Sequence, residues 1–326
     1  MNERNRLSGL QIPKVFHIKF LCLVLLFLCL GVPGLHSAET SVQKVAVLVS
    51  LNIRPYIDAV EGLTEHLSGQ NSVVIEVFNM ENYTGNARNI LSKSLSDEKF
   101  DICIAVGPEA ARFIWTGDLA DQVLKIYTMV LNPDKIVDEK EPVCGISLDI
   151  PVKMVMQIFS KALPSLTRIG LLFDPENNSA FARQVILEAA VMDLEVIPLK
   201  VSLRKQIPAV LNAHWRRIDG LWLIPDQTII TESLVRYIIK QSISHGKAVF
   251  GYNRFFYKSG AALCYILDYR EIGKQTAQLL LAMLTGQDCK KQTPVFKIWY
   301  NPRILNRLGI DLVMDPSAGM KIEPGP

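Results

Sequence analysis

Short apolar runs alternate with amphipathic stretches along most of the chain. The runs are rich in valine, isoleucine and leucine, and many are nearly continuous, as in the segment KVAVLVS at 44–50. Strands with this pattern are buried on both faces of a sheet. The stretches between them place apolar residues at helical spacing, as at Ile57, Val60 and Leu63. Strands and helices that alternate in this way favour parallel β-α-β units.

The predicted elements form two groups of similar build. In the first group, strands are expected at 44–50, 73–80, 100–107 and 125–133, and helices at 56–67, at 85–95 and from Pro108. In the second group, strands are expected at 168–175, 195–201, 219–226 and 247–253, and helices at 179–192, 203–214 and 230–245. We therefore expect an α/β fold with two Rossmann-like lobes, each with a parallel sheet, joined near 143–152.

Parallel sheets bind ligands beyond the carboxyl ends of their strands. The segments that follow the predicted strands are polar or contain glycine or proline. They lie at 50–55, 107–111 and 131–133 in the first lobe and at 174–179, 225–228 and 252–256 in the second. We expect these two sets of loops to face each other across a cleft between the lobes.

The loops offer both charge and hydrogen-bonding groups. Arg54 and Arg254 carry guanidinium groups that suit a carboxylate, while Glu109, Asp226 and Asp268 are suited to an amine, so the set favours a zwitterionic ligand. The alternative is that the asparagine, aspartate and serine residues only form turns and helix caps. The candidate ligand-binding residues are Asn52, Arg54, Gly107, Glu109, Asn132, Asn177, Asn178, Ser179, Asp226, Gln227, Thr228, Asn253, Arg254 and Asp268.

Motifs for enzyme chemistry, cofactors and metals are missing from the sequence. It contains no GxGxxG after a strand, no P-loop, no GxSxG elbow, no HExxH and no CxxC pair. The histidines beyond residue 38 are His66, His214 and His245, which fall in or at the ends of predicted helices. We expect no cofactor, no metal and no catalytic residue, although a carboxylate pair of the glycosidase type remains an open alternative.

The first 38 residues have the layout of a secretory signal peptide. A basic lead precedes the apolar run FLCLVLLFLCL at 20–30, and Ser37-Ala38 follow a Pro-Gly break. Because His36 does not fit the usual cleavage pattern, an uncleaved anchor is the alternative. Without residues 1–38, the Lys and Arg total falls from 35 to 31 and the Asp and Glu total from 32 to 31. This balance does not favour a nucleic-acid partner.

Several longer segments resemble one known family. They are FDICIAVGPEAA at 100–111, VCGISLDIPVKMVMQIFSKALPSLTRIGLLFDPENNS at 143–179, DGLWLIPDQTII at 219–230 and GAALCYILDYREIGKQTAQLLLAMLTG at 260–286. The chain resembles the ABC transporter substrate-binding family that includes tryptophan- and tyrosine-binding lipoproteins, over about 42–312. Gln227 stands where the family usually has asparagine, and Glu109 where it usually has a small hydroxyl residue, so the resemblance does not imply an aromatic amino acid as ligand.

The resemblance implies the type I periplasmic-binding-protein fold, with three chain crossings between the lobes. The expected domains are a signal peptide or anchor at 1–38, an N-terminal lobe at 39–146 plus 268–291, a C-terminal lobe at 147–267 plus 292–314, and a flexible tail at 315–326. Cys144 and Cys264 fall at equivalent places in the two expected hinge strands. A disulfide between them is one hypothesis, and unpaired buried thiols are the alternative.

The resemblance further implies a monomeric, exported, periplasmic or extracytoplasmic receptor. It would close on a small ligand, such as an amino acid or a similar zwitterion or carboxylate, and deliver it to an ABC permease in the membrane. One alternative is a receptor of the same fold that signals to a membrane partner. The other is an exported enzyme, which would need a nucleophile or base that the loops do not supply.

Overall fold

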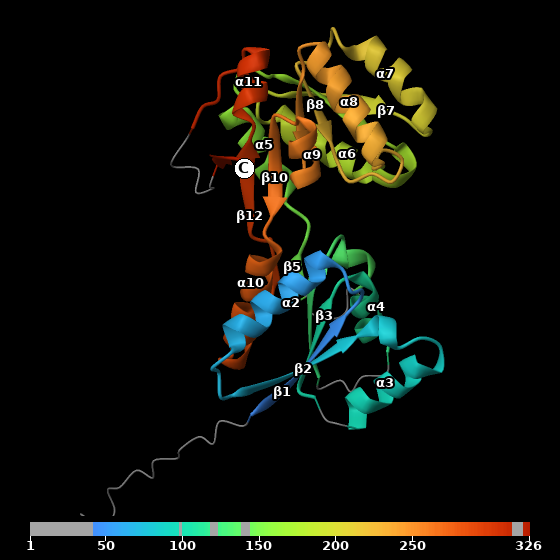
Figure 1. Cartoon of the computed structure of the whole chain (residues 1–326), viewed down its shortest axis with the longest axis vertical. Helices are drawn as coiled ribbons and strands as arrows, with labels where there is room; N and C mark the ends of the chain where they lie inside the picture. Colours follow the sequence, from blue (N-terminus) through green and yellow to red (C-terminus); the bar gives the residue numbers. More distant parts are fainter. Residues whose placement is uncertain (1–41, 98–99, 118–122, 138–143, 315–321) are drawn as a thin grey trace, which may run out of the picture. The chain divides into compact units, whose positions relative to one another are not determined.

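The computed structural model describes residues 42–97, 100–117, 123–137, 144–314 and 322–326. The expected signal peptide or anchor and residues 315–321 of the expected tail lie outside the described residues. Within the described part of the chain, the strands form two sheets. Figure 1 draws the first in blue to green, except for β11 near the red end of the colour scale, and the second in green to red. The α/β fold with two parallel sheets is confirmed.

The first sheet has the order β11-β5-β4-β3-β1-β2, and all its strand pairs are parallel. Side chains of alternate residues in β1 enter two different cores: Val45 and Val47 face one, and Ala46 and Leu48 face the other. Burial on both faces explains the continuous apolar runs. The strands are β1 (Gln43–Val49), β2 (Val73–Asn79), β3 (Ile102–Val106), β4 (Leu124–Val130), β5 (Gly145–Ser147) and β11 (Lys291–Gln292).

Together with four α-helices of the described residues, the first sheet forms what we call the N-terminal lobe. One face of the sheet packs against α2 and α10, and the other packs against α3 and α4. Pro108 begins α4, as predicted, because proline tolerates the first helical turn. The helices are α2 (Arg54–Leu67), α3 (Asn86–Asp97), α4 (Pro108–Thr116) and α10 (Tyr269–Leu284).

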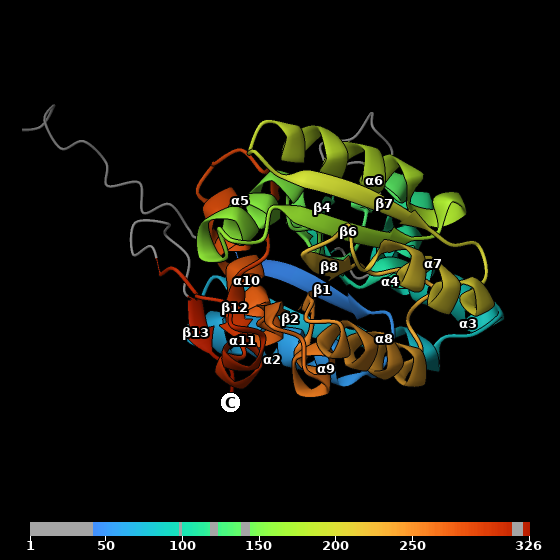
Figure 2. The ribbon, with the colours of Figure 1, turned by 90° about the horizontal axis from the view of Figure 1, so that it is seen from above.

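The second sheet has the order β13-β12-β10-β9-β8-β6-β7. Its strand pairs are parallel except for the antiparallel pair of β10 and β12. Figure 2 shows β6 and β7 side by side. The strands are β6 (Arg168–Phe173), β7 (Glu195–Lys200), β8 (Gly220–Leu223), β9 (Ala248–Gly251), β10 (Leu263–Leu267), β12 (Phe296–Tyr300) and β13 (Ile322–Pro324).

Helices cover both faces of the second sheet, and with it they form what we call the C-terminal lobe. Leu171 in β6 enters a core shared with α5 and α6, and the adjacent Leu172 enters a core shared with α7 and α8. The helices are α5 (Val152–Ala162), α6 (Pro175–Ala190), α7 (Ile207–His214), α8 (Glu232–Ser244), α9 (Arg254–Ser259) and α11 (Pro302–Leu308).

The chain passes between the sheets three times, after β5, after β10 and after β11. The second crossing brings α10 back to the N-terminal lobe, where it lies beside α2 (Figure 1). The hydroxyl of Thr276 in α10 donates a hydrogen bond of 2.9 Å to the Thr128 hydroxyl in β4. These crossings agree with the fold that the resemblance implies, while the exact lobe boundaries stay predictions.

The observed α6 begins earlier than predicted. The sequence predicts a polar loop at 174–179 and a helix from Ser179, but α6 starts at Pro175. Asp174 caps it, because the carboxylate of Asp174 accepts a hydrogen bond of 3.0 Å from the backbone N–H of Glu176. The backbone at Asn178 is non-helical and bends the first turn.

The disulfide hypothesis for Cys144 and Cys264 is wrong, because Cys144 is bonded to Cys289. Cys144 immediately precedes β5 and Cys289 lies just before β11, and these two strands pair in the first sheet. Their Cα atoms are 5.2 Å apart, within the range that a disulfide spans. Cys264 is a buried free thiol in β10 of the second sheet. Cys103, in β3 of the first sheet, is also a buried free thiol.

The last described residues belong to the second sheet. Ile322–Pro324 form β13, which pairs with β12, although they fall in the expected tail. The Tyr257 hydroxyl also donates a hydrogen bond of 2.9 Å to the carbonyl of Gly325. Backbone pairing therefore orders these residues despite their proline and glycine content.

Candidate ligand-binding site

Two buried aspartates organise the carboxyl edge of the second sheet. Asp174 follows β6 and Asp226 follows β8, and both are almost fully buried. The Asp226 carboxylate accepts hydrogen bonds from the backbone N–H groups of Asp174 at 2.7 Å and of Thr228 at 2.9 Å. The Thr228 hydroxyl donates in turn to the Asp174 carboxylate at 2.6 Å. Buried carboxylates need such donors, so the two loops are held as one unit.

Asn178 belongs to the same network. Its side-chain amide donates to the Asp226 carboxylate at 2.8 Å and approaches the carbonyl of Pro225 at 3.4 Å. The hydroxyl of Ser179 donates to the carbonyl of Pro175 within α6. The structure therefore brings Asn178, Asp226 and Thr228 together, as the position of their loops suggested, and Asp226 serves to hold these loops.

Gln227 and Asn177 carry exposed side-chain amides in the same two loops. Arg204 holds the backbone of this loop, because its guanidinium donates hydrogen bonds to the carbonyls of Thr228 at 3.1 Å and Gln227 at 3.3 Å. A buried network beneath exposed amides gives side chains that can contact a ligand from a rigid support.

The loop after β9 carries Tyr252, Asn253 and Arg254. Asn253 caps α9, because its side-chain oxygen accepts a hydrogen bond of 3.1 Å from the N–H of Phe256. Arg254 is exposed and its guanidinium carbon lies 5.3 Å from the centre of the Trp299 ring. Burial raises the pKa of Tyr252 to about 12, and the negative charge of Asp226 adds to this effect.

In the N-terminal lobe, Gly107 ends β3 with a φ of 94°, a conformation that favours glycine. A Cβ atom at Gly107 would lie 2.7 Å from the Ser50 hydroxyl and 2.8 Å from the Tyr56 ring. The buried Ser50 hydroxyl accepts a hydrogen bond of 2.9 Å from the N–H of Ala110 in α4. The loops after β1 and β3 are therefore in direct contact through these small groups.

Glu109 lies in the first turn of α4, directly after Gly107 and Pro108. Its Oε2 atom is buried and has no hydrogen-bond partner among the residues that the structure describes. Burial raises the pKa of the Tyr56 hydroxyl, and the charge of Glu109 raises it further. A carboxylate and a phenol thus lie near each other at the carboxyl end of β3.

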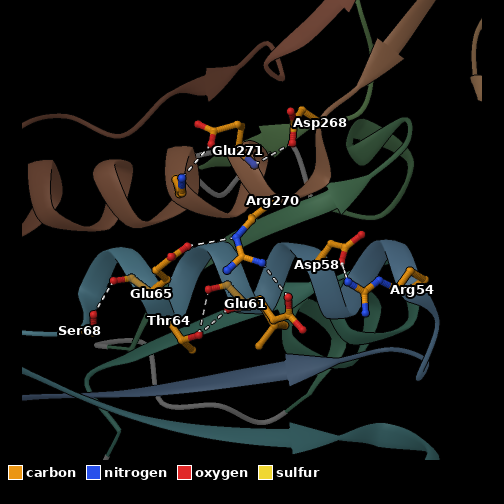
Figure 3. Close-up of polar contacts among 11 residues, drawn as sticks. Arg54, Asp58, Glu61, Thr64, Glu65, Ser68, Asp268, Arg270 and Glu271 are labelled. Carbon is orange, nitrogen blue, oxygen red and sulfur yellow. Dashed lines mark hydrogen bonds and ion pairs between the residues drawn. The ribbon is translucent and has the colours of Figure 1, made fainter. Parts of the chain in front are cut away.

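Two other candidates in the N-terminal lobe lie on the surface. The N–H of Asn52 donates a hydrogen bond of 2.6 Å to the Glu81 carboxylate, and the exposed Arg54 forms an ion pair of 2.7 Å with Asp58 one turn along α2 (Figure 3). Any carboxylate ligand at Arg54 would compete with Asp58.

The last two candidates lie close to chain crossings. Asn132 has a left-handed backbone, and its N–H donates to the Asp149 carboxylate at 3.1 Å and 3.2 Å. Asp268 caps α10 by accepting from the N–H of Glu271 at 3.3 Å, and it pairs with Lys297 at 3.2 Å. The structure uses Asp268 as a helix cap, which was the alternative role considered from the sequence.

Sequence reasoning missed several residues that shape these loops. Ser50 is a small polar residue at a strand end, and Arg204 comes from a turn before α7. Tyr56 and Tyr252 were overlooked because aromatic residues at helical or strand spacing are typical of cores. The burial of Ser50 was the missing signal, and it is visible only in the folded chain.

The described residues hold no group of three or more histidine, cysteine, aspartate or glutamate side chains that could bind a metal ion. Within the same residues, no helix combines the length and apolarity that crossing a membrane requires.

Comparisons with known proteins identify the family to which the chain belongs. The family model described as ABC transporter substrate binding protein matches residues 44–313. The chain belongs to this family. Members of the ABC transporter substrate-binding family are substrate-binding proteins and not enzymes.

Among curated proteins, a tyrosine-binding protein of Clostridioides difficile (strain R20291) is 20% identical over 225 residues. The alignment covers 67% of this chain and 64% of that protein. This chain therefore matches slightly less than two thirds of its relative's length.

Two solved structures share the fold. The ligand-free, open structure of a substrate-binding protein with adhesive properties from Clostridium difficile has a TM-score of 0.70 at 17% identity, and covers 87% of this chain and 100% of its own. The structure of an ABC domain in complex with L-Trp from Streptococcus pneumonia has a TM-score of 0.56 at 19% identity and the same coverage. The type I periplasmic-binding-protein fold is confirmed.

Proposed function

We propose that this substrate-binding protein is an exported receptor that closes on an amino acid or a similar small zwitterion and delivers it to an ABC permease. The observation that carries the proposal is the hydrogen-bonded unit of Asp174, Asp226, Thr228 and Asn178, which supports exposed amides at the edge of a parallel sheet. Such edges are where ligands bind in this class of fold.

The charged side chains of these loops support a ligand that carries both a positive and a negative charge. Arg54 and Arg254 are exposed and present guanidinium groups, which suit a carboxylate. Glu109 presents a carboxylate, which suits an ammonium group. In this proposal the exposed amides of Asn177 and Gln227 add hydrogen bonds that orient the ligand, while Asp226 and Thr228 hold the loop. The printed names of the relatives, a tyrosine-binding protein and a domain in complex with L-Trp, support the amino-acid class.

Thermal-shift screening of the purified protein tests the ligand class. The panel contains the L-amino acids, their desamino and decarboxylated analogues, short peptides and several sugars. A ligand at a hundred times its Kd stabilises the folded state by about 2.7 kcal/mol, so at least one amino acid should raise the melting temperature. Gln227→Ala should reduce this shift, whereas Gln278→Ala on the exposed side of α10 should not. A melting shift with a sugar alone would overturn the proposal.

A second experiment tests export and transport. Fractionation of cells that produce the full chain should place the protein outside the cytoplasm, and deletion of its gene should lower uptake of the ligand found in the screen. If uptake is unchanged but a transcriptional response to the ligand is lost, the protein is a sensor for a membrane partner instead.

A further inference from the structure

The first turn of α4 contains a carboxylate oxygen that the protein itself does not satisfy. Oε2 of Glu109 is buried and lacks a hydrogen-bond partner among the described residues. A buried charged oxygen without a donor is unfavourable. Such an atom at the carboxyl end of a central parallel strand therefore points to a donor that arrives with a ligand.

The surroundings of Glu109 favour a cation over an anion. A helix N-terminus usually attracts anions through its free N–H groups, but the Ser50 hydroxyl already occupies the N–H of Ala110 at 2.9 Å. Glu109 itself supplies negative charge to this first turn. A second anion beside Glu109 would be repelled, whereas a cation would pair with it.

A tyrosine lies beside this carboxylate. The ring of Tyr56 lies against Gly107, where it would meet an added Cβ atom at 2.8 Å. The Tyr56 side chain is partly buried and packs on the core of the N-terminal lobe. Tyrosine rings attract cations through their faces, and their hydroxyl oxygens accept hydrogen bonds from an ammonium group.

Arg54 in α2 and Arg270 in α10 are paired with acids other than Glu109. Figure 3 shows Arg54 directed to Asp58, and Arg270 lying between Glu61 and Glu65. These ion pairs measure 2.7 Å for Arg54 and 2.9 Å and 3.1 Å for Arg270. Acids of α2 engage both guanidinium groups, so the cation for Glu109 is expected to come with the ligand.

We infer that Glu109 and Tyr56 form a subsite for a primary ammonium group of the ligand. The inference deepens the proposed function and rests on it for the position of the ligand. Glu109 supplies the counter-charge and accepts N–H hydrogen bonds, and Tyr56 lies beside the cation. A ligand without an ammonium group leaves the Glu109 oxygen unsatisfied and binds more weakly.

The chain supplies a matched control for Glu109. Glu76 is an exposed glutamate in the middle of β2 and lies outside the loops that follow the strands. E76Q therefore removes the same charge from the same lobe without touching the subsite or the other proposed ligand contacts. Melting of the ligand-free variants by circular dichroism shows that each one is folded.

Calorimetric titration of the full chain tests the subsite with defined probes. The probes are the L-amino acids, tyramine and 1,4-diaminobutane, which carry ammonium groups, and 3-(4-hydroxyphenyl)propanoate, which does not. E109Q should weaken the tightest ammonium probe on the order of tenfold to a hundredfold. Y56A should weaken it severalfold, and E76Q should not change it. Binding of the propanoate should be unaffected or improved in E109Q.

The outcomes separate the inference from the proposed function. If an amino acid binds wild type and E109Q equally, the subsite is wrong and the proposed function stands. If the simple amines bind through Glu109 but no amino acid does, the subsite stands and the proposed ligand class is wrong. If no ammonium probe binds the wild type, the subsite is wrong.

Discussion

The Thr228 hydroxyl donates a hydrogen bond of 2.6 Å to the Asp174 carboxylate, and it joins the loop after β8 to the cap of α6. Asp174 is almost fully buried, so loss of this donor leaves a charged oxygen without compensation. We predict that Thr228→Val lowers the free energy of unfolding by about 1–3 kcal/mol. Urea unfolding followed by circular dichroism measures the change.

The same substitution a few residues away provides the control. Thr231 directly precedes α8 at the N-cap position, but its side chain forms no capping hydrogen bond. Thr231→Val should therefore cost much less than Thr228→Val. Equal losses in the two variants would mean that the bond to Asp174 adds nothing to stability.

A second prediction concerns the contact between α2 and α10. A Cβ atom at Gly273 would overlap the backbone carbonyl of Ala59, so the two helices touch through their main chains. Helix propensity alone would make Gly273→Ala stabilising by about 1 kcal/mol. We predict the opposite sign, a loss of about 1–3 kcal/mol, because backbone atoms must move apart to admit the methyl group.

Gln278→Ala in the same helix is the control, since this side chain is exposed and alanine favours a helix. It should leave the free energy of unfolding nearly unchanged. A Gly273→Ala variant more stable than wild type in urea would contradict the close packing of α2 and α10.

Most strands were predictable because burial within a sheet leaves a clear apolar pattern in the sequence, whereas β11, β12 and β13 were not predicted. The segment at 168–175 was predicted as a strand, and β6 occupies Arg168–Phe173. The start of α6 was missed, although Asp174-Pro175-Glu176 combines a capping residue, proline and an acidic first turn. The six residues at 174–179 are all polar or proline, and the apolar spacing that marks a helix begins only after them. The start of α6 was therefore read as a loop.

Partners that are distant in sequence could not be predicted. Asp174 and Thr228 are 54 residues apart, and their contact depends on β6 lying beside β8. The partner of Cys144 was missed for a similar reason. Cys289 lies just before β11, which has two residues, too few to produce a hydrophobic pattern.

The third prediction concerns this disulfide. The bond between Cys144 and Cys289 connects the segments that lead into β5 and β11, each of which precedes a chain crossing. Removing it with the double change Cys144→Ser and Cys289→Ser should lower the free energy of unfolding by about 2–5 kcal/mol. Reduction of the wild type should have a similar effect, and chemical denaturation measures both.

Peptide mapping under non-reducing conditions checks the pairing directly. A linked peptide pair containing Cys144 and Cys289 is expected. Cys103 should resist alkylation in the native protein, because burial raises its pKa to about 12 and suppresses the reactive thiolate. Recovery of unlinked peptides for both Cys144 and Cys289 from protein kept oxidised would contradict the pairing.

The fourth prediction is a loss of stability at high pH that involves Tyr252. Its ring lies 4.5 Å from Phe256 and 6.2 Å from Tyr265 between ring centres. Burial first, and then the charge of Asp226, raise the pKa of Tyr252 to about 12 from 10.0. Between these two values the phenol ionises in the unfolded chain while it stays neutral in the folded one. The contribution of the neutral Tyr252 phenol to the free energy of unfolding is therefore complete below about pH 10, and it is lost as the pH rises toward about 12.

Urea unfolding of wild type and Tyr252→Phe between pH 8 and pH 12 tests this prediction on the linkage principle. The variant lacks an ionisable group at this position, so its stability should fall less steeply above about pH 10 than that of wild type. Tyr237→Phe changes an exposed tyrosine of α8 and should keep the slope of wild type. If Tyr252→Phe follows the wild-type curve throughout, Tyr252 does not couple folding to pH.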